Sequence, residues 1–98
     1  MKISKKMHEK VSTVGTIIEQ SIRDEVSGIE VDSTWETSYD FRSIKLLKTR
    51  LIVCYSEWDG VTIKERRDSI KLSDIEAVNY TLSWIRRCIR KGYKQNSN

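Results

Sequence analysis

The sequence contains no proline, a single histidine (His8) and only two cysteines, Cys54 and Cys88. Without proline, no helix or strand is interrupted from within by a missing amide donor. Histidine-dependent catalysis has one candidate, His8, which lies in the first turns of a predicted helix, and no Gly-x-Ser-x-Gly turn accompanies any serine. Both cysteines lie in apolar runs with no Cys/His cluster around them, which is typical of buried thiols. We therefore expect a non-enzymatic protein without a metal ion or other cofactor.

The sequence also lacks an apolar run of 18 residues, so we expect no membrane-spanning helix. Its basic start is followed by a short apolar stretch that soon reaches Glu19 and Gln20, which indicates an amphipathic helix and not a secretion signal. We expect a cytoplasmic protein. The 98 residues are 38% hydrophobic and 33% charged, which predicts one domain over 1–98, with an ordered core of about 5–92 and a loose polar tail at 93–98.

Apolar residues spaced by three and four positions predict two helices. The first covers about 5–27 and is followed by Ser27-Gly28 as a stop signal. The second runs from 74 to about 91, after the capping box Ser73-Asp74-Ile75-Glu76 and before Gly92.

The residues between these helices predict three strands. Alternation over 29–41 indicates one half-buried strand that ends in a turn at Tyr39-Asp40, and 44–58 indicates a central strand. The dipeptide Asp59-Gly60 then predicts a hairpin into a third strand at 61–67, with a bulge near 67–69. We predict an α+β fold of order α-β-β-β-α, with two helices packed on one face of a three-stranded antiparallel meander. The inner face of this sheet is expected to carry Val31, Trp35, Leu51, Val53 and Ile63.

This order of elements resembles that of double-stranded RNA-binding domains. In that family, lysines at the start of the second helix clamp phosphates, whereas the helix here opens with Ser73-Asp74-Ile75-Glu76. Small phage-encoded inhibitor proteins also combine a short meander with flanking helices. Both resemblances concern architecture, which does not by itself define function.

The net charge of +4 is unevenly distributed, because residues 61–98 carry nine bases and four acids. Clustered bases attract phosphates and gain affinity by releasing counterions, although helix dipoles and exposed sheet edges also favour such charges. We predict a nucleic-acid-binding surface, with Trp58 and Tyr93 as stacking groups. The expected phosphate contacts are Arg42, Lys45, Lys48, Arg50, Lys64, Arg66, Arg86, Arg87, Arg90 and Lys91.

Lys64 and Arg66 are expected on the same outer sheet face as Lys48 and Arg50. The same face, where Ile52, Cys54 and Trp58 lie among charges, also suits a protein-interaction module. Such a module, for example a phage or mobile-element accessory protein, would bind a host protein or a second copy of itself as a homodimer.

A third and weaker hypothesis is a metal-dependent nuclease that uses Glu30, Asp32 and Glu36. These acids occupy even positions, so on a single strand they share one face, where paired carboxylates can hold magnesium. Ion pairing with Lys48 and Arg50 across neighbouring strands accounts for the same acids more simply.

Overall fold

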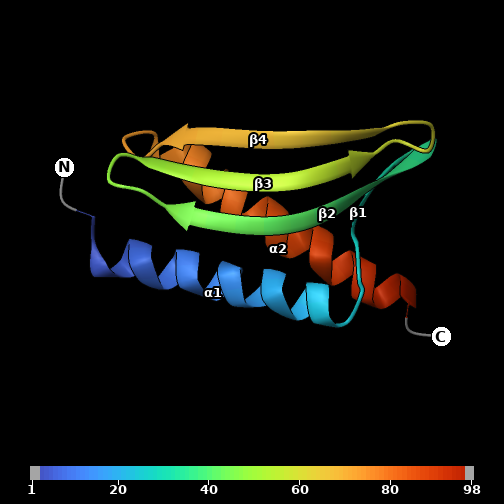
Figure 1. Cartoon of the computed structure of the whole chain (residues 1–98), viewed down its shortest axis with the longest axis horizontal. Helices are drawn as coiled ribbons and strands as arrows, with labels where there is room; N and C mark the ends of the chain where they lie inside the picture. The colour runs from blue at the N-terminus through green and yellow to red at the C-terminus, as the bar shows by residue number, and fades with distance from the viewer. Residues whose placement is uncertain (1–2, 97–98) are drawn as a thin grey trace.

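The computed structural model describes residues 3–96, which form two helices and a four-stranded antiparallel sheet (Figure 1). The α+β class and the antiparallel meander are confirmed, whereas the predicted number of three strands is wrong. The strands follow one another in the sheet in the order β1-β2-β3-β4. The elements are α1 (Lys5–Arg23), β1 (Gly28–Asp32), β2 (Trp35–Leu46), β3 (Arg50–Trp58), β4 (Ile63–Lys71) and α2 (Ile75–Asn96).

The additional strand arises because the expected first strand is folded back on itself. A two-residue turn at 33–34 pairs Asp32 with Trp35, and the Asp32 carboxylate accepts a hydrogen bond from the Ser33 amide at 2.8 Å. The expected turn at Tyr39-Asp40 is therefore wrong, since both residues lie inside β2. The order of elements becomes α-β-β-β-β-α, so the order shared with double-stranded RNA-binding domains does not hold.

The sheet contains one irregularity, and it lies in β2 and not in β4. The register between β2 and β3 shifts between Phe41 and Ser43, which allows both Phe41 and Ile44 to face the helices. The bulge expected near 67–69 is absent, because β3 and β4 pair without interruption from Trp58↔Ile63 to Arg50↔Lys71. In this register Ile63 shares a face with Trp58 and not with Leu51, so the expected faces of 61–67 are reversed.

The core lies between the two helices and one face of the sheet. Leu51 and Val53 of β3 are completely buried, as predicted, and they pack with Val14 of α1 and Ile85 of α2. The other three expected inner-face residues are exposed, which corrects the prediction; they are Val31 at 53%, Trp35 at 69% and Ile63 at 71%. Val31 and Trp35 flank the turn at 33–34 at one end of the sheet, and Ile63 lies opposite Trp58 on the side that the helices do not cover.

Both helices end at positions that the sequence did not indicate. The first helix stops at Arg23, earlier than expected, and Glu25 then takes a left-handed conformation with φ of 54°. The second helix passes through Gly92 and reaches Asn96, so the expected stop at Gly92 is wrong and residues 93–96 are helical. Glycine is required at 92 because a Cβ there would overlap the carbonyl oxygen of Ser27. Residues 97–98 of the expected tail lie outside the described residues.

Candidate functional site

The helices cover one face of the sheet and leave the other uncovered, and we call the uncovered side of β2, β3 and β4 the open face. Residues directly opposite each other in an antiparallel pair point to the same side of the sheet, so the register defines its rows. From the β2–β3 turn to the β3–β4 turn, the rows are Arg50–Lys71, Lys45–Ile52–Ser69, Ser43–Cys54–Arg67, Asp40–Ser56–Glu65 and Ser38–Trp58–Ile63.

Four exposed cations gather on one half of the open face, and we call Lys45, Arg50, Arg67 and Lys71 the basic half. Within residues 3–96, none of the four forms an ion pair. The Arg50 side chain donates a 3.2 Å hydrogen bond to the neutral Ser69 hydroxyl. With strands about 4.8 Å apart and about 3.4 Å per residue, these charges cover roughly 10 by 14 Å. Their field is therefore directed at solvent and favours anions.

A polar row separates the basic half from the rest of the open face. Arg42 Nη2 lies 3.3 Å from a carboxylate oxygen of Glu65, and it donates a hydrogen bond of 2.7 Å to the Ser56 hydroxyl. Ser56 donates in turn to Glu65 at 2.8 Å, and Asp40 accepts a hydrogen bond from the Ser27 hydroxyl at 2.6 Å. Arg42 is therefore largely neutralised by its neighbour, unlike the four cations of the basic half.

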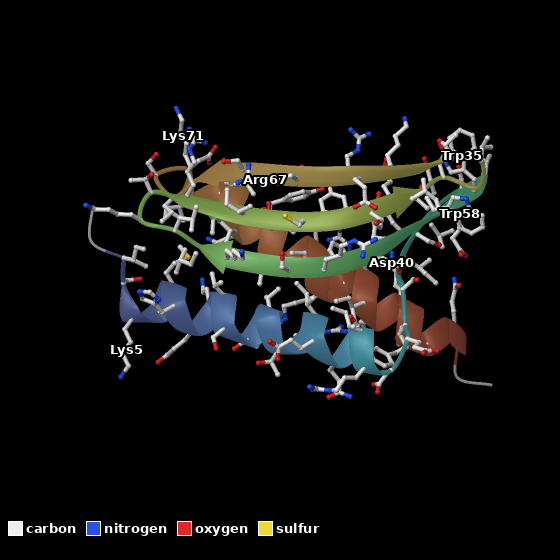
Figure 2. The ribbon with its side chains drawn as sticks, viewed as in Figure 1. Lys5, Trp35, Asp40, Trp58, Arg67 and Lys71 are labelled. Atoms are coloured by element: carbon white, nitrogen blue, oxygen red, sulfur yellow. The ribbon has the colours of Figure 1, made fainter. Side chains whose placement is uncertain are left out.

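Large apolar side chains gather at the opposite end of the sheet, where the β1–β2 and β3–β4 turns lie. Figure 2 shows Trp35 and Trp58 together at this end, with Lys71 at the other end of the sheet. We define the apolar end as Val31, Trp35, Trp58, Val61 and Ile63, which are between 49% and 86% exposed. Exposed apolar groups that cluster in this way mark binding surfaces more often than solvated surface.

The structure brings together only part of the predicted phosphate-binding set. Arg42, Lys45 and Arg50 lie on the open face, and Lys48 lies in the adjoining β2–β3 turn. Trp58, the first expected stacking residue, also lies on the open face.

The remaining cations of that set point elsewhere. Lys64 and Arg66 lie opposite Glu57 and Tyr55, so they project from the helix-covered side, and their expected placement beside Arg50 is wrong. Arg66 forms a 3.4 Å ion pair with Glu57.

The bases of α2 belong to the helical side of the molecule. Arg87 Nη2 lies 3.6 Å from Glu30, while Arg86 and Arg90 line shallow grooves beside α1. Lys91 is half-buried on the same helix. Tyr93, the second expected stacking residue, also lies on α2, and its hydroxyl donates to Asp24 at 2.9 Å. These residues do not extend the open face.

Arg67 and Lys71 belong to the basic half and were missed. Their face follows from counting in steps of two from the Asp59-Gly60 hairpin, provided that no bulge interrupts β4. The expectation that Val61 and Ile63 face the core put the odd-numbered residues of this strand, Arg67 included, on the wrong side. Lys71 lies beyond the expected end of the strand at residue 67.

The three acids of the metal hypothesis do not share a face. Glu30 and Asp32 lie on β1 with one orientation, whereas Glu36 lies opposite Val31 and has the other. Glu30 is already engaged, because it accepts hydrogen bonds from Trp84 Nε1 at 3.1 Å and from the Tyr39 hydroxyl at 3.5 Å. Among the described residues, no group of three His, Cys, Asp or Glu side chains could hold a metal ion.

The two thiols differ in their surroundings. Cys88 is completely buried, and this burial raises the pKa of its thiol to about 11. It is therefore a neutral core residue at physiological pH and not an activated nucleophile. Cys54 is half-buried in the middle of the open face, between Ser43 and Arg67.

A groove of about 410 Å³ lies between the end of α1 and strand β2. Its charged lining consists of Glu25, Asp40 and Arg42, so carboxylates outnumber cations there. An anion would be disfavoured in this groove, which sets it apart from the basic half.

Comparison of the chain with family models, with curated proteins and with solved structures found no match. No helix in residues 3–96 is both long enough and apolar enough to cross a membrane.

Proposed function

We propose that this chain is a non-enzymatic nucleic-acid-binding module that holds phosphates on the basic half of its open face. The observation that carries the proposal is the set of four exposed cations, Lys45, Arg50, Arg67 and Lys71, that have no ion-pair partner within residues 3–96. Phosphates that bind there would replace the counterions of both partners, and the release of those ions supplies the affinity.

The neighbouring residues favour a single strand over a duplex. Trp58 lies on the same face as the basic half and is 49% exposed, so its ring is accessible to an unstacked base. It lies four residues beyond Cys54 on β3, a distance of about 14 Å. A strand that places phosphates on the basic half can therefore place a base on Trp58 within a few nucleotides.

The proposal predicts a specific dependence on salt. If the four cations each neutralise one phosphate of a single strand, log affinity should fall with log salt with a slope of about −3. Fluorescence anisotropy with a labelled single-stranded oligonucleotide of mixed sequence, as DNA and as RNA, would measure this slope. A duplex of the same sequence tests the preference for single strands.

A matched pair of variants identifies the surface. Lys45→Glu with Lys71→Glu reverses two charges of the basic half, and we expect affinity to fall by about tenfold or more. Lys5→Glu with Lys6→Glu makes the same change of net charge on α1, away from the open face, and should have a much smaller effect (Figure 2). The proposal fails if the wild-type protein binds no oligonucleotide at low salt, or if the two variants lose affinity equally.

A protein partner is the second candidate, and the apolar end favours it. Val61 and Ile63 are 86% and 71% exposed beside Trp58, which suits an apolar contact with another protein. The test is capture of a partner from nuclease-treated lysate, repeated with Val61→Ser combined with Ile63→Thr. A partner that this variant loses and that the Lys45→Glu, Lys71→Glu variant retains would favour this second function over the first.

A further inference from the structure

Strand β4 has one free edge. It pairs with β3 over the nine residues Ile63–Lys71, and no other strand within residues 3–96 pairs with its outer side. It contains no proline and no bulge, and apart from Asp68 and Ile70 its residues are exposed. A long, unbroken edge of this kind is a template for pairing with another chain.

The hydrogen bonds at the two ends of β4 show which backbone groups point outward. The Asp59 amide donates to the Thr62 carbonyl at 3.4 Å, and the Leu72 amide donates to the Thr49 carbonyl at 3.0 Å. Even-numbered residues of β4 therefore direct their N–H and C=O groups toward β3. The odd-numbered residues Ile63, Glu65, Arg67, Ser69 and Lys71 present theirs at the free edge.

This parity restricts how two copies could pair symmetrically. In an antiparallel pair, the outward groups of one strand must face those of the other, so an odd residue must lie opposite an odd residue. Pairing centred on Arg66, in which Arg66 lies opposite Arg66 of the second copy, meets this condition. It sets Glu65 opposite Arg67 of the second copy. It also sets Lys64 opposite Asp68 of the second copy, and the two-fold symmetry repeats both pairs.

In the neighbouring registers, the charges that lie opposite each other are less complementary. Pairing centred on Glu65 opposes Glu65 to itself and Lys64 to Arg66, which brings like charges together. Pairing centred on Arg67 leaves only Arg66 with Asp68 as an opposite-charge combination. In the register centred on Arg66, the one like pair is Arg66 with itself, and Glu57 lies 3.4 Å from that guanidinium in each copy.

We propose that two copies of this chain pair antiparallel through their β4 edges, in the register centred on Arg66, to form one continuous eight-stranded sheet. About eight backbone hydrogen bonds join the two strands, from the outward groups of Ile63, Glu65, Arg67 and Ser69. The two-fold axis is perpendicular to the sheet, so both open faces lie on the same side with Arg67 near the centre. The edge contact is small, so the dimer is expected to depend on concentration. The proposed dimer rests on the β4 edge and not on nucleic-acid binding, although it would set Arg67 of the basic half opposite Glu65 of the second copy.

A charge exchange tests the register. Glu65→Lys and Arg67→Glu each place like charges opposite each other in a homodimer, so each variant alone should dimerise at least tenfold more weakly than the wild-type chain. Mixed in equal amounts, the two variants restore opposite charges at both positions and should form a heterodimer of nearly wild-type affinity. Sedimentation velocity over a concentration series measures all three samples.

A backbone variant supplies a second test without a change of charge. The Ser69 amide points outward, so Ser69→Pro leaves the bonding to β3 intact while it blocks pairing of the edge. We expect this variant to have the wild-type circular dichroism spectrum and to be monomeric. A wild-type chain that stays monomeric at the highest soluble concentration would overturn the proposal. So would dimers that persist in Ser69→Pro, or a mixture no more dimeric than its separate components.

The same samples separate this proposal from the proposed function. Lys45→Glu with Lys71→Glu changes the basic half and should leave the dimer intact, because neither side chain faces a charged residue in this register. Loss of oligonucleotide binding with retained dimers would therefore concern the open face alone.

Discussion

The indole Nε1 of Trp84 in α2 donates a hydrogen bond to a carboxylate oxygen of Glu30 in β1, at 3.1 Å. The same carboxylate lies 3.6 Å from the Arg87 guanidinium. The Trp84 ring packs edge-on against Tyr39 and Phe41, with centroids 5.0 and 5.2 Å apart. Glu30 thus fixes the ring that joins α2 to the aromatic part of the core.

We expect Glu30→Ala to destabilise the protein by about 1 to 3 kcal/mol, because it leaves the partly buried indole N–H without its acceptor. Glu30→Gln keeps an acceptor and should cost less. Urea denaturation measures both effects. Glu36→Ala, at an exposed carboxylate on the adjacent strand, is the control and should be nearly neutral. Equal losses at Glu30 and Glu36 would contradict the role of the hydrogen bond.

Two helical glycines should respond to alanine in opposite directions. At Gly15, a Cβ would meet Ile44 at 3.5 Å, which is ordinary contact, so Gly15→Ala should stabilise by up to about 1 kcal/mol through helix propensity. At Gly92, a Cβ would overlap the Ser27 carbonyl oxygen. Gly92→Ala should therefore destabilise by about 1 to 3 kcal/mol, because the helix must move away from the α1–β1 connection. Thermal unfolding compares the two variants, and a gain at both sites would contradict the close approach at Gly92.

Stability should fall in alkaline solution because of two core tyrosines. Burial, followed by the nearby charge of Glu30, raises the pKa of Tyr39 to about 12. Burial and a hydrogen bond to Asp68 also raise the pKa of Tyr55. Because the folded state favours the neutral phenol, this stabilisation is complete below the ordinary tyrosine pKa of 10.0 and is lost as pH rises through about 12.

The measurement is the free energy of unfolding across this alkaline range, together with phenolate absorbance. The free energy of unfolding should fall less steeply with rising pH in Tyr39→Phe than in the wild-type chain, by up to about 1.4 kcal/mol per pH unit. A Tyr39→Phe variant with the wild-type pH dependence would contradict the assignment.

The two thiols should react at very different rates. Cys54 is partly accessible on the open face, whereas Cys88 is completely buried and its pKa is raised to about 11. A thiol-specific reagent should therefore modify one thiol in the folded chain and the second only on unfolding. Cys54→Ser removes the fast reaction and identifies the site. If both thiols react at one rate in native buffer, the burial of Cys88 is contradicted.

The sequence indicated both helices because their apolar stripes repeat every three to four residues, as in Val11, Val14 and Ile18. It also indicated the hairpin at Asp59-Gly60, where Gly60 has φ of 96° and Asp59 accepts from the Val61 and Thr62 amides. The turn at 33–34 was missed because it consists of serine and threonine, with no glycine or asparagine to signal it. Alternation of polar and apolar residues continues through that turn, so this pattern alone predicts one strand where the structure has two.

The candidate site was predicted in part for the same reason. Arg50 and Trp58 were assigned to the open face from a strand whose parity is correct, whereas Lys45 reaches it because a turn at 47–49 divides the expected strand 44–58. The expected faces of Lys64 and Arg66 followed from placing the exposed Val61 and Ile63 in the core. A single misplaced residue in a strand reverses every side chain beyond it. The contacts of Arg87 with Glu30 and of Tyr93 with Asp24 join distant parts of the chain, and no local pattern signals them.

Each strand of the meander pairs with its neighbour in the chain, and this has a kinetic consequence. Short loops close quickly, whereas the junction of α2 with β1, at Trp84 and Glu30, joins residues 54 positions apart. We expect this junction to form after the transition state, so Glu30→Ala should accelerate unfolding and leave the refolding rate almost unchanged in stopped-flow measurements. Slowed refolding of this variant would instead place the junction in the folding nucleus. If the junction between α2 and β1 forms last, it is also the first contact to open. Unfolding would then begin with the release of α2 from β1.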